Sequence, residues 1–289
     1  VGAEGTLGVV TEVTLRLTRR PETVQLVMAA FTSTDHAGGA VSDIIAAGIL
    51  PAAIEMMDHL SIQAVEQATH AGYPISAGAL LLVELDGPAA EVEALIDSIE
   101  AICQKNEAWE VRRAADAAER LLMWKGRKAA FAAMGRISPS YYVQDGVIPR
   151  TTLPAVLRRI DELAATYGMQ VANVFHAGDG NLHPLVLYDA RIEGQQERAE
   201  ELATAILLTC VEHGGSLTGE HGIGVDKMKH MPKLFTDDDL DTMQRVRCAF
   251  DPHHLSNPGK VFPTPRLCGE APGPGQTHPL VEAGVAEMF

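Results

Sequence analysis

Segments of the chain switch between two spacings of apolar residues, one typical of strands and one typical of amphipathic helices. In the first half, short apolar runs each precede a longer segment with helical spacing. The predicted strands cover residues 25–31, 52–57, 79–85 and 109–114, and the predicted helices cover residues 35–48, 59–70, 88–105 and 115–134. This half is therefore expected to combine a sheet with covering helices.

The second half continues the alternation, with a predicted hairpin at its centre. Residues 171–189 contain two apolar runs on either side of Gly-Asp-Gly-Asn, a pattern typical of two paired strands. The other predicted elements are a strand over residues 141–148 and helices over residues 153–167, 195–213, 226–234 and 236–250. The expected fold class is α+β, with an antiparallel or mixed sheet and covering helices.

Both ends of the chain differ from this central pattern. Residues 9–17 alternate apolar and polar side chains like a strand, and Arg-Arg-Pro ends the alternation. The chain enters this pattern directly from Val1, so we expect residues 1–20 to close a preceding domain and residues 21–263 to form the main one. The proline-rich residues 264–289 are expected to form an irregular tail.

The charge of the chain limits its partners. Its 38 Asp and Glu residues exceed its 23 Lys and Arg residues and give a formal net charge of −15. The sequence contains no basic stripe, which argues against a nucleic-acid partner.

No run approaches the roughly 18 apolar residues that a transmembrane helix needs. The cysteines form neither a CxxC pair nor a secreted disulfide framework, so we expect a cytoplasmic protein.

Two glycine-rich motifs carry the side chains best suited to bind a metal. In HAGDGNLHP, His176 and His183 flank the predicted turn, so a hairpin brings both imidazoles to one end of the sheet. In GEHGIG, Glu220 and His221 lie between glycines that permit an irregular backbone. Two imidazoles and a carboxylate form a ligand set for Zn²⁺, Mn²⁺ or Fe²⁺ with positions left open for a substrate. His221 then remains as a general base near neutral pH.

These motifs also have a purely structural interpretation. A single histidine in a hairpin is more often a hydrogen-bonded structural residue than a metal ligand, and Gly-Asp-Gly-Asn is by itself a good turn. The combination with GEHGIG favours the metal site over the structural interpretation of His176. The other histidines lack comparable glycine framing and are interpreted as surface or packing residues.

Two further segments have a weaker connection to chemistry. Arg127 lies on a predicted helix, where its guanidinium can bind a small carboxylate with two hydrogen bonds. A cation on the helix surface is at least as good an interpretation of this residue. The glycines of GAEGTLG, residues 2–8, let backbone amides approach a ligand, but the segment is neither a GxGxxG motif nor a P-loop.

Several segments in order resemble the FAD-linked 2-hydroxy-acid oxidase family, in which glycolate oxidases and D-lactate dehydrogenases are found. They are residues 2–17, 126–150, 171–184, 219–224 and 251–260. HAGDGNLHP with GEHGIG is highly specific, and the resemblance covers nearly the whole chain. It implies the last strand of a flavin-binding domain of the vanillyl-alcohol-oxidase type, followed by an α+β cap domain that shapes the substrate site.

The resemblance also assigns roles to individual residues. His176, His183 and Glu220 match the family's metal ligands. His221 matches the base that removes the hydroxyl proton as hydride leaves Cα for the flavin, and Arg127 matches the arginine that binds the substrate carboxylate. The residues that match flavin-contacting or polar positions of the site are Glu4, Gly5, Thr6, Gly8, Asn181 and Asn257.

The substrate and partners are likewise implied by the resemblance. Phe131 and Val143 stand where relatives that act on larger dicarboxylates carry Thr and Lys, which favours a small monocarboxylate such as glycolate or D-lactate. FAD is the implied cofactor. The implied electron acceptors are an iron–sulfur protein and a second subunit of the flavin-domain type, which could hold the protein at the inner membrane.

Two other functions compete with this hypothesis. A His/His/Glu site also serves zinc hydrolases. A bound metal can alternatively stabilise an interaction module that has no catalytic role. Reduction of a dye coupled to FAD, measured beside ester or peptide cleavage, distinguishes the oxidoreductase from the hydrolase, and the interaction module predicts neither activity.

Overall fold

The longest strands of the chain lie within an antiparallel sheet. In a computed structural model, residues 1–263 of the chain are described, and their contacts divide the chain into two units. The larger unit spans Leu17–Glu220 and contains the sheet, and the described part of the smaller unit combines residues 1–16 with residues 221–263. The tail expected over residues 264–289 lies outside the described residues.

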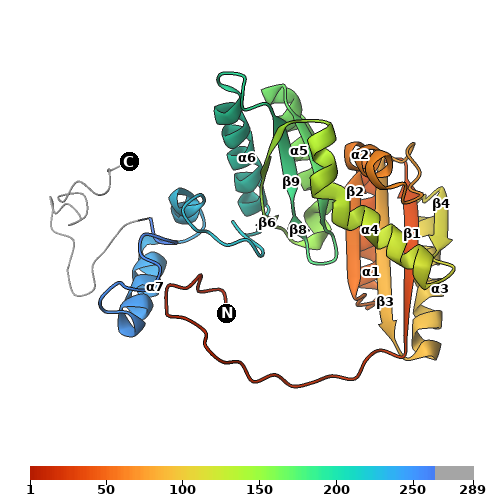
Figure 1. The fold of residues 1–289 in the computed structure, drawn as a ribbon, viewed down its shortest axis with the longest axis horizontal. Helices are drawn as coiled ribbons and strands as arrows, with labels where there is room; N and C mark the ends of the chain where they lie inside the picture. The colour runs from red at the N-terminus through yellow and green to blue at the C-terminus, as the bar shows by residue number, and fades with distance from the viewer. Residues whose placement is uncertain (264–289) are drawn as a thin grey trace. The chain divides into compact units, whose positions relative to one another are not determined.

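The strands and helices of the larger unit alternate along the chain, largely as predicted (Figure 1). The strands are β1 (Thr23–Phe31), β2 (Ala53–Asp58), β3 (Ala79–Gly87), β4 (Glu110–Arg113), β5 (Ser140–Val143), β6 (Gly146–Val147), β7 (Gln170–His176), β8 (Asn181–Leu182) and β9 (Pro184–Tyr188). The helices are α1 (Thr34–Ala46), α2 (His59–Thr69), α3 (Ala89–Lys105), α4 (Ala117–Ala133), α5 (Leu153–Tyr167) and α6 (Gln195–Glu212), with short 3₁₀ helices η1 (Met134–Arg136) and η2 (Arg150–Thr152).

The order of the strands in the sheet differs from their order along the chain. Its main path runs β4-β1-β3-β2-β7-β8-β6, and β9 pairs with both β7 and β5. The pairings between these strands are antiparallel. This arrangement confirms the α+β class with an antiparallel sheet. It also brings β2, from the first half of the chain, beside β7 from the second.

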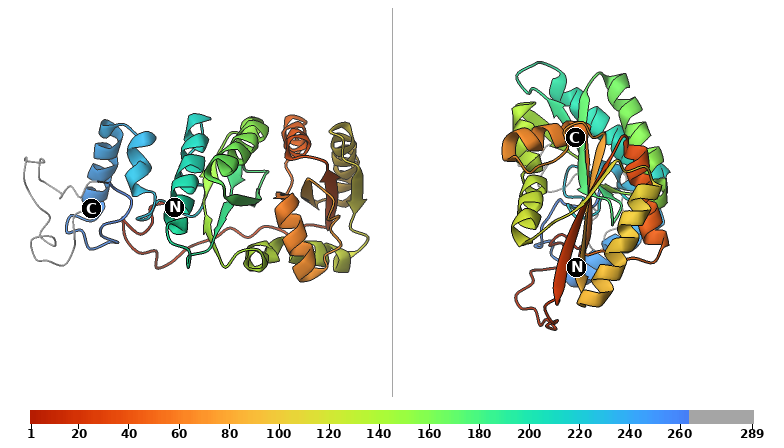
Figure 2. Two further views of the ribbon diagram at one scale, coloured as in Figure 1. Left: turned by 90° about the horizontal axis from the view of Figure 1, so that it is seen from above. Right: turned by 90° about the vertical axis from the view of Figure 1, so that its right-hand side faces the viewer.

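Helices cover both faces of the sheet (Figure 2). Successive residues of a strand point to opposite faces, and β1 shows this clearly. Val27 and Phe31 pack in a core cluster with α1, α3, α5 and α6. Leu26 and Met28 pack in the opposite cluster, with α2 and α4. Because both faces are covered, the central strands are apolar at nearly every position, which explains the continuous apolar runs in the sequence.

Capping residues set several helix boundaries. Asp58 and Asp116 precede α2 and α4, and their carboxylates accept hydrogen bonds from backbone amides in the first turn of each helix. In α5, a proline lies in the first turn and Gly168 ends the helix in a left-handed conformation. The predicted boundaries therefore agree with the observed ones to within a few residues.

The hairpin predicted around Gly-Asp-Gly-Asn is formed by β7, β8 and β9. His176 and Asn181 pair across the turn, and β7 continues alongside β9. Gly180 in the turn has a φ angle of 70°, and a Cβ at this position would lie 2.2 Å from the carbonyl oxygen of Ile148. Both the backbone conformation and the available space therefore require glycine here.

The strand predicted over residues 9–17 is not formed. Its apolar side chains are exposed, with Val9 at 88% and Leu15 at 75%. A strand is stable only when neighbouring strands satisfy its backbone hydrogen bonds, and no described strand pairs with this segment. Alternating polarity alone was therefore insufficient to predict its conformation.

Two other predicted elements differ in detail. The strand expected over residues 141–148 is divided into β5 and β6, which pair with different strands, β9 and β8. Gln144 and Asp145, between them, are both buried. The helix expected over residues 226–234 is the 3₁₀ helix η3 (Met228–Lys233), which contains a proline that lacks a backbone donor.

The smaller unit contains the helix α7 (Asp237–Phe250). Thr236 and Asp239 form a capping box at its start. Immediately after the helix, the carboxylate of Asp251 accepts the backbone N–H groups of Leu255 and Ser256 at 3.0 and 2.7 Å. These bonds fold the DPHHLSNPGK segment into a defined loop.

Replacing Phe31 by alanine tests the packing of the first core cluster. Phe31 is fully buried, so Phe31→Ala should lower the free energy of unfolding by about 3–5 kcal/mol through lost burial and a residual cavity. Urea unfolding followed by circular dichroism measures the change. Leu121→Ala, at a side chain 64% exposed, serves as the control and should change stability by less than about 0.5 kcal/mol.

The thiol of Cys103 offers a second test of the same core. Burial, with a smaller contribution from Glu100, raises the pKa of Cys103 to about 12. Since the thiolate is the reactive form, the native chain should resist iodoacetamide at Cys103 at about pH 8 and react there only after unfolding. Peptide mass spectrometry after timed labelling measures this, and rapid labelling of the native protein would contradict the packing described.

Candidate functional site

Strand alternation directs three ionisable side chains toward the sheet face that α2 and α4 cover. Glu55 on β2 lies directly opposite His176 on β7 in the antiparallel ladder. Residues opposed in this way point to the same side of a sheet. His183 lies two residues before Leu185, which packs in the cluster with α2 and α4, so it faces the same side.

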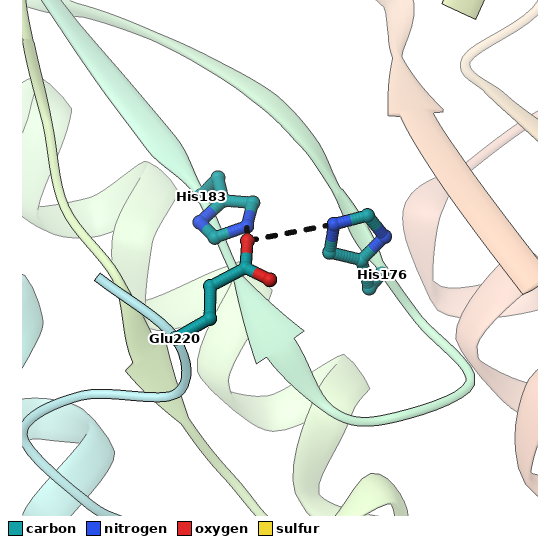
Figure 3. Close-up of side chains that lie close together, drawn as sticks. All are labelled: His176, His183 and Glu220. Carbon is teal, nitrogen blue, oxygen red and sulfur yellow. Dashed lines mark hydrogen bonds and ion pairs between the residues drawn. The ribbon is translucent and has the colours of Figure 1, made fainter. Parts of the chain in front are cut away.

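His176, His183 and Glu220 form the cluster predicted from the two sequence motifs (Figure 3). One potential ligand atom from each residue lies within 4.8 Å of the other two. Oε1 of Glu220 is 2.9 Å from Nε2 of His183 and 3.6 Å from Nε2 of His176. The two imidazole rings are nearly perpendicular, with centroids 5.3 Å apart. Both Nε2 atoms are therefore close to one carboxylate oxygen.

Asp145 holds the backbone that carries Glu220. Its fully buried carboxylate accepts the N–H of Gly219 at 3.0 Å and that of Glu220 at 3.2 Å. It also accepts the hydroxyl of Thr218 at 2.5 Å. A buried carboxylate therefore fixes this short loop, next to the isolated antiparallel bridge between Ser216 and Val147.

Asn181 lies against the same loop. A Cβ at Gly219 would come within 2.5 Å of the Asn181 side chain, so only glycine allows this close approach. Asn181 is 6% exposed and is paired with His176 in the strand ladder. The structure therefore brings this residue, predicted as a polar contact, next to both His176 and the loop of Glu220.

Glu55 connects His176 to Arg127. Its Oε1 atom lies 2.8 Å from Nδ1 of His176, and its Oε2 atom lies 3.0 Å from Nε and 2.8 Å from Nη2 of Arg127. Glu55 is 5% exposed. Its hydrogen bond raises the pKa of His176 above the usual value, against the opposing effect of partial burial.

Arg127 lies inside the protein rather than on the surface of its helix. Its side chain projects from α4 toward the sheet and is 8% exposed, which excludes the interpretation as a solvated surface cation. Lys128, the next residue, is exposed. Trp124, one turn earlier, donates its indole N–H to Glu84 rather than to the cluster.

The cluster has the chemistry required for a divalent ion. Two neutral imidazoles and one carboxylate suit Zn²⁺, Mn²⁺ or Fe²⁺. Because Nδ1 of His176 is bonded to Glu55, its Nε2 atom is the one directed toward Glu220. A carboxylate behind a ligating histidine is a common arrangement in metal sites. The residues present therefore fit a metal site.

A cavity reaches His176 and Glu55 but is not lined by His183, Glu220 or Arg127. Its volume is about 210 Å³, and its lining residues include Arg150.

The smaller unit brings together four residues predicted to contact a flavin. The carboxylate of Glu4 accepts the N–H groups of Ile223 and Gly224 at 2.7 and 2.8 Å, and its carbonyl oxygen accepts Nδ2 of Asn257 at 2.6 Å. The other members are Gly5, next to Asn257, and Thr6, which is 4% exposed and donates to the carbonyl oxygen of Ala3. A Cβ at Gly8 would meet no atom within 4 Å.

His221, the predicted base, is the first residue of the smaller unit after Glu220. Its side chain is exposed. It follows a metal-ligand candidate directly in the chain, and the remainder of GEHGIG is bonded to Glu4.

Two residues of the site were not identified from the sequence. Glu55 lies in the run AAIEMM, where one acid interrupts a strand that is otherwise apolar. Asp145 interrupts YYVQDGVI in the same way. A charged residue within a buried strand requires a compensating partner, so each interruption was a usable signal, although it could not reveal which partner was involved.

No helix within residues 1–263 combines the length and apolar character needed to cross a bilayer.

Comparison with known proteins identifies the family. Residues 20–261 match the family described as FAD linked oxidases, C-terminal domain. The glycolate oxidase subunit GlcD of Escherichia coli strain K12 is 52% identical over 269 residues, which make up 93% of this chain and 54% of that protein. The mitochondrial D-lactate dehydrogenase [cytochrome] of Arabidopsis thaliana is 29% identical over 270 residues, or 93% of this chain and 47% of that protein.

A solved structure supports the fold independently. The 4-ethylphenol oxidase of Gulosibacter chungangensis superimposes with a TM-score of 0.64 at 14% identity, over 87% of this chain and 56% of that one. The chain thus spans about half the length of the relatives it matches. Its antiparallel sheet covered by helices and its match over residues 20–261 show that the chain belongs to the family of FAD-linked oxidases, as their C-terminal domain.

Proposed function

We propose that this chain forms the substrate-binding and metal-binding part of an FAD-dependent dehydrogenase that oxidises a small 2-hydroxy acid, glycolate or D-lactate. The observation that carries the proposal is the cluster of His176, His183 and Glu220, connected to Arg127 through Glu55. Similarity to a glycolate oxidase subunit and to D-lactate dehydrogenases supports the substrate class.

The proposed division of the chain follows the same relatives. Residues 1–20 close a flavin-binding domain, residues 21–263 form the cap domain that shapes the substrate site, and residues 264–289 form a tail. The bonds of Glu4 to GEHGIG and to Asn257 support a common role for these segments near the flavin. Gly5, Thr6 and Gly8 belong to the same role.

The reaction removes a proton and a hydride from the substrate and leaves a 2-oxo acid. When bound, the metal lowers the pKa of the substrate hydroxyl, and FAD accepts the hydride from Cα. Within the chain, His176, His183 and Glu220 hold the ion, and His221 accepts the hydroxyl proton. Asn181 contributes a polar contact to the substrate or flavin.

Arg127 is proposed to bind the substrate carboxylate. Glu55 occupies its Nε and Nη2 atoms, and no hydrogen bond to Nη1 is found among the described residues. The two N–H groups of Nη1 can therefore be offered to a substrate. The bond to Glu55 also fixes the guanidinium plane, which lowers the entropy lost when a carboxylate binds.

Electron transfer is proposed to continue to partner proteins. The relative from Escherichia coli is named as a subunit of glycolate oxidase, which supports assembly with other chains. The proposed partners are an iron–sulfur subunit and a second subunit of the flavin-domain type, in a cytoplasmic complex that could contact the inner membrane through them.

Removing one metal ligand tests the proposal. His176→Ala in the full-length protein should lower kcat for glycolate or D-lactate by more than about 100-fold, beyond the roughly 10–100-fold effects of outer-shell residues. Metal content by mass spectrometry should fall in parallel. His36→Ala, at a partly exposed histidine of α1 outside the cluster, is the matched control and should retain both.

The competing functions predict different results in the same assay. Full dye reduction by His176→Ala would overturn the metal assignment. Cleavage of esters or peptides that depends on His176, without dye reduction, would establish a hydrolase. Metal binding with neither activity in the full-length protein would indicate an interaction module.

A second prediction concerns substrate size. The ring centroids of Phe131 and His183 are 6.3 Å apart. Phe131 and Val143 both pack against the core cluster that contains residues of α2 and α4. A second carboxylate on the substrate would face these apolar groups without a positive partner, which is costly. The kcat/KM for glycolate or D-lactate should therefore exceed that for a 2-hydroxy dicarboxylate by about tenfold or more, and Val143→Lys should reduce this preference. Equal rates on both acids would contradict it.

A further inference from the structure

One carboxylate, that of Glu55, contacts a predicted metal ligand and the predicted substrate-binding arginine. Oε1 is 2.8 Å from Nδ1 of His176, and Oε2 is within 3.0 Å of two nitrogens of Arg127. Neither motif that identified the site includes Glu55. The role of this residue therefore follows from the tertiary structure alone.

The position of Glu55 is set by the centre of the sheet. It lies on β2 between Ile54 and Met56, both buried in the first core cluster, and its own side chain points to the opposite face. The ladder register places it directly across from His176. The Glu55 carboxylate cannot move far without displacing core side chains, so its position relative to the sheet is fixed.

Both partners of Glu55 require a hydrogen-bond acceptor. A neutral histidine that binds a metal through Nε2 must carry its proton on Nδ1 and donate it. Arg127 offers only donors. Two donors facing one side chain require two acceptor oxygens, which a carboxylate has and an amide of the same shape lacks.

We propose that Glu55 is a positioning residue that sets both the tautomer of His176 and the orientation of Arg127. It holds the proton on Nδ1 of His176, which leaves Nε2 available to the ion, and it holds the guanidinium on the same face of the sheet. This role rests on the metal site of the proposed function. Because one carboxylate serves both partners, a change at Arg127 is expected to alter metal affinity without touching a ligand.

Glu84 provides a matched comparison within the same sheet. It lies on β3, next to β2, and contacts two residues of α4: it accepts the indole N–H of Trp124 at 2.6 Å and pairs with Arg120 at 3.6 Å. Like Glu55, it is a Glu on a strand with partners on α4, although its side chain is 19% exposed and that of Glu55 is 7% exposed. It differs from Glu55 in having no bond to a predicted metal ligand.

The test compares Glu55→Gln with Glu84→Gln in the full chain. In the metal-free protein at about pH 8.5, about two units above the unperturbed histidine pKa, ¹⁵N NMR of the imidazole nitrogens reports which nitrogens of His176 carry a proton. Glu55→Gln should shift His176 away from the Nδ1-protonated form. Its affinity for Zn²⁺, measured by competition with a chromophoric chelator, should fall about 10–100-fold. Glu84→Gln should leave both unchanged.

A double variant keeps the test informative if Glu55→Gln alone fails to fold. Glu55→Gln leaves Arg127 buried without its counter-charge, which can unfold the chain. In Glu55→Gln/Arg127→Met, the amide oxygen no longer has two donors to serve and can accept from His176. This variant should recover the Nδ1 tautomer and most of the Zn²⁺ affinity. Failure of the double variant to improve on a folded single variant would overturn the proposal.

The remaining outcomes separate this inference from the proposed function. An unchanged His176 tautomer in folded Glu55→Gln overturns the role of Glu55, whether or not the protein binds metal. If the unsubstituted chain binds no Zn²⁺ while the tautomer still depends on Glu55, the metal assignment of the proposed function fails and the positioning of His176 stands.

Discussion

The antiparallel pairing of β2 with β7 is the constraint on which the site depends. Its register sets Glu55 opposite His176, and the same face receives Arg127 from α4 and His183 from the hairpin. A shift of one residue in this register would send His176 to the other face of the sheet. The extensive core on both faces therefore also maintains the geometry of the candidate site, because it excludes such a shift.

The net charge of the chain also bears on how the candidate site could attract an acid. The chain carries a net charge of −15, which repels a carboxylate substrate at long range. Arg127 alone does not reverse this locally, because Glu55 neutralises it and Glu220 adds a further negative charge. With neutral imidazoles the group is formally negative, and a divalent ion makes it positive. On the proposed function, the ion is thus as important for attracting the acid as for activating it.

Sequence patterns predicted the sheet and its covering helices well, because continuous apolar runs and amphipathic segments reflect burial directly. They also identified His176, His183 and Glu220, since glycine-framed histidines on a hairpin end up at one place. They were wrong for residues 9–17, where alternation without a partner strand produced no strand. They did not reveal Glu55 or Asp145, whose roles depend on residues far away in the chain.

By itself, then, the sequence determined the fold class, the acidic character of the chain and the three side chains that cluster at the candidate metal site. These features are local, or depend on motifs that a tight turn brings together. Only the tertiary structure decided that Arg127 is buried rather than solvated, that Glu55 joins it to His176, and that Asp145 anchors the loop of Glu220. Each of these contacts depends on which strands become neighbours, and the order of the strands in the sheet cannot be read from local patterns of polarity.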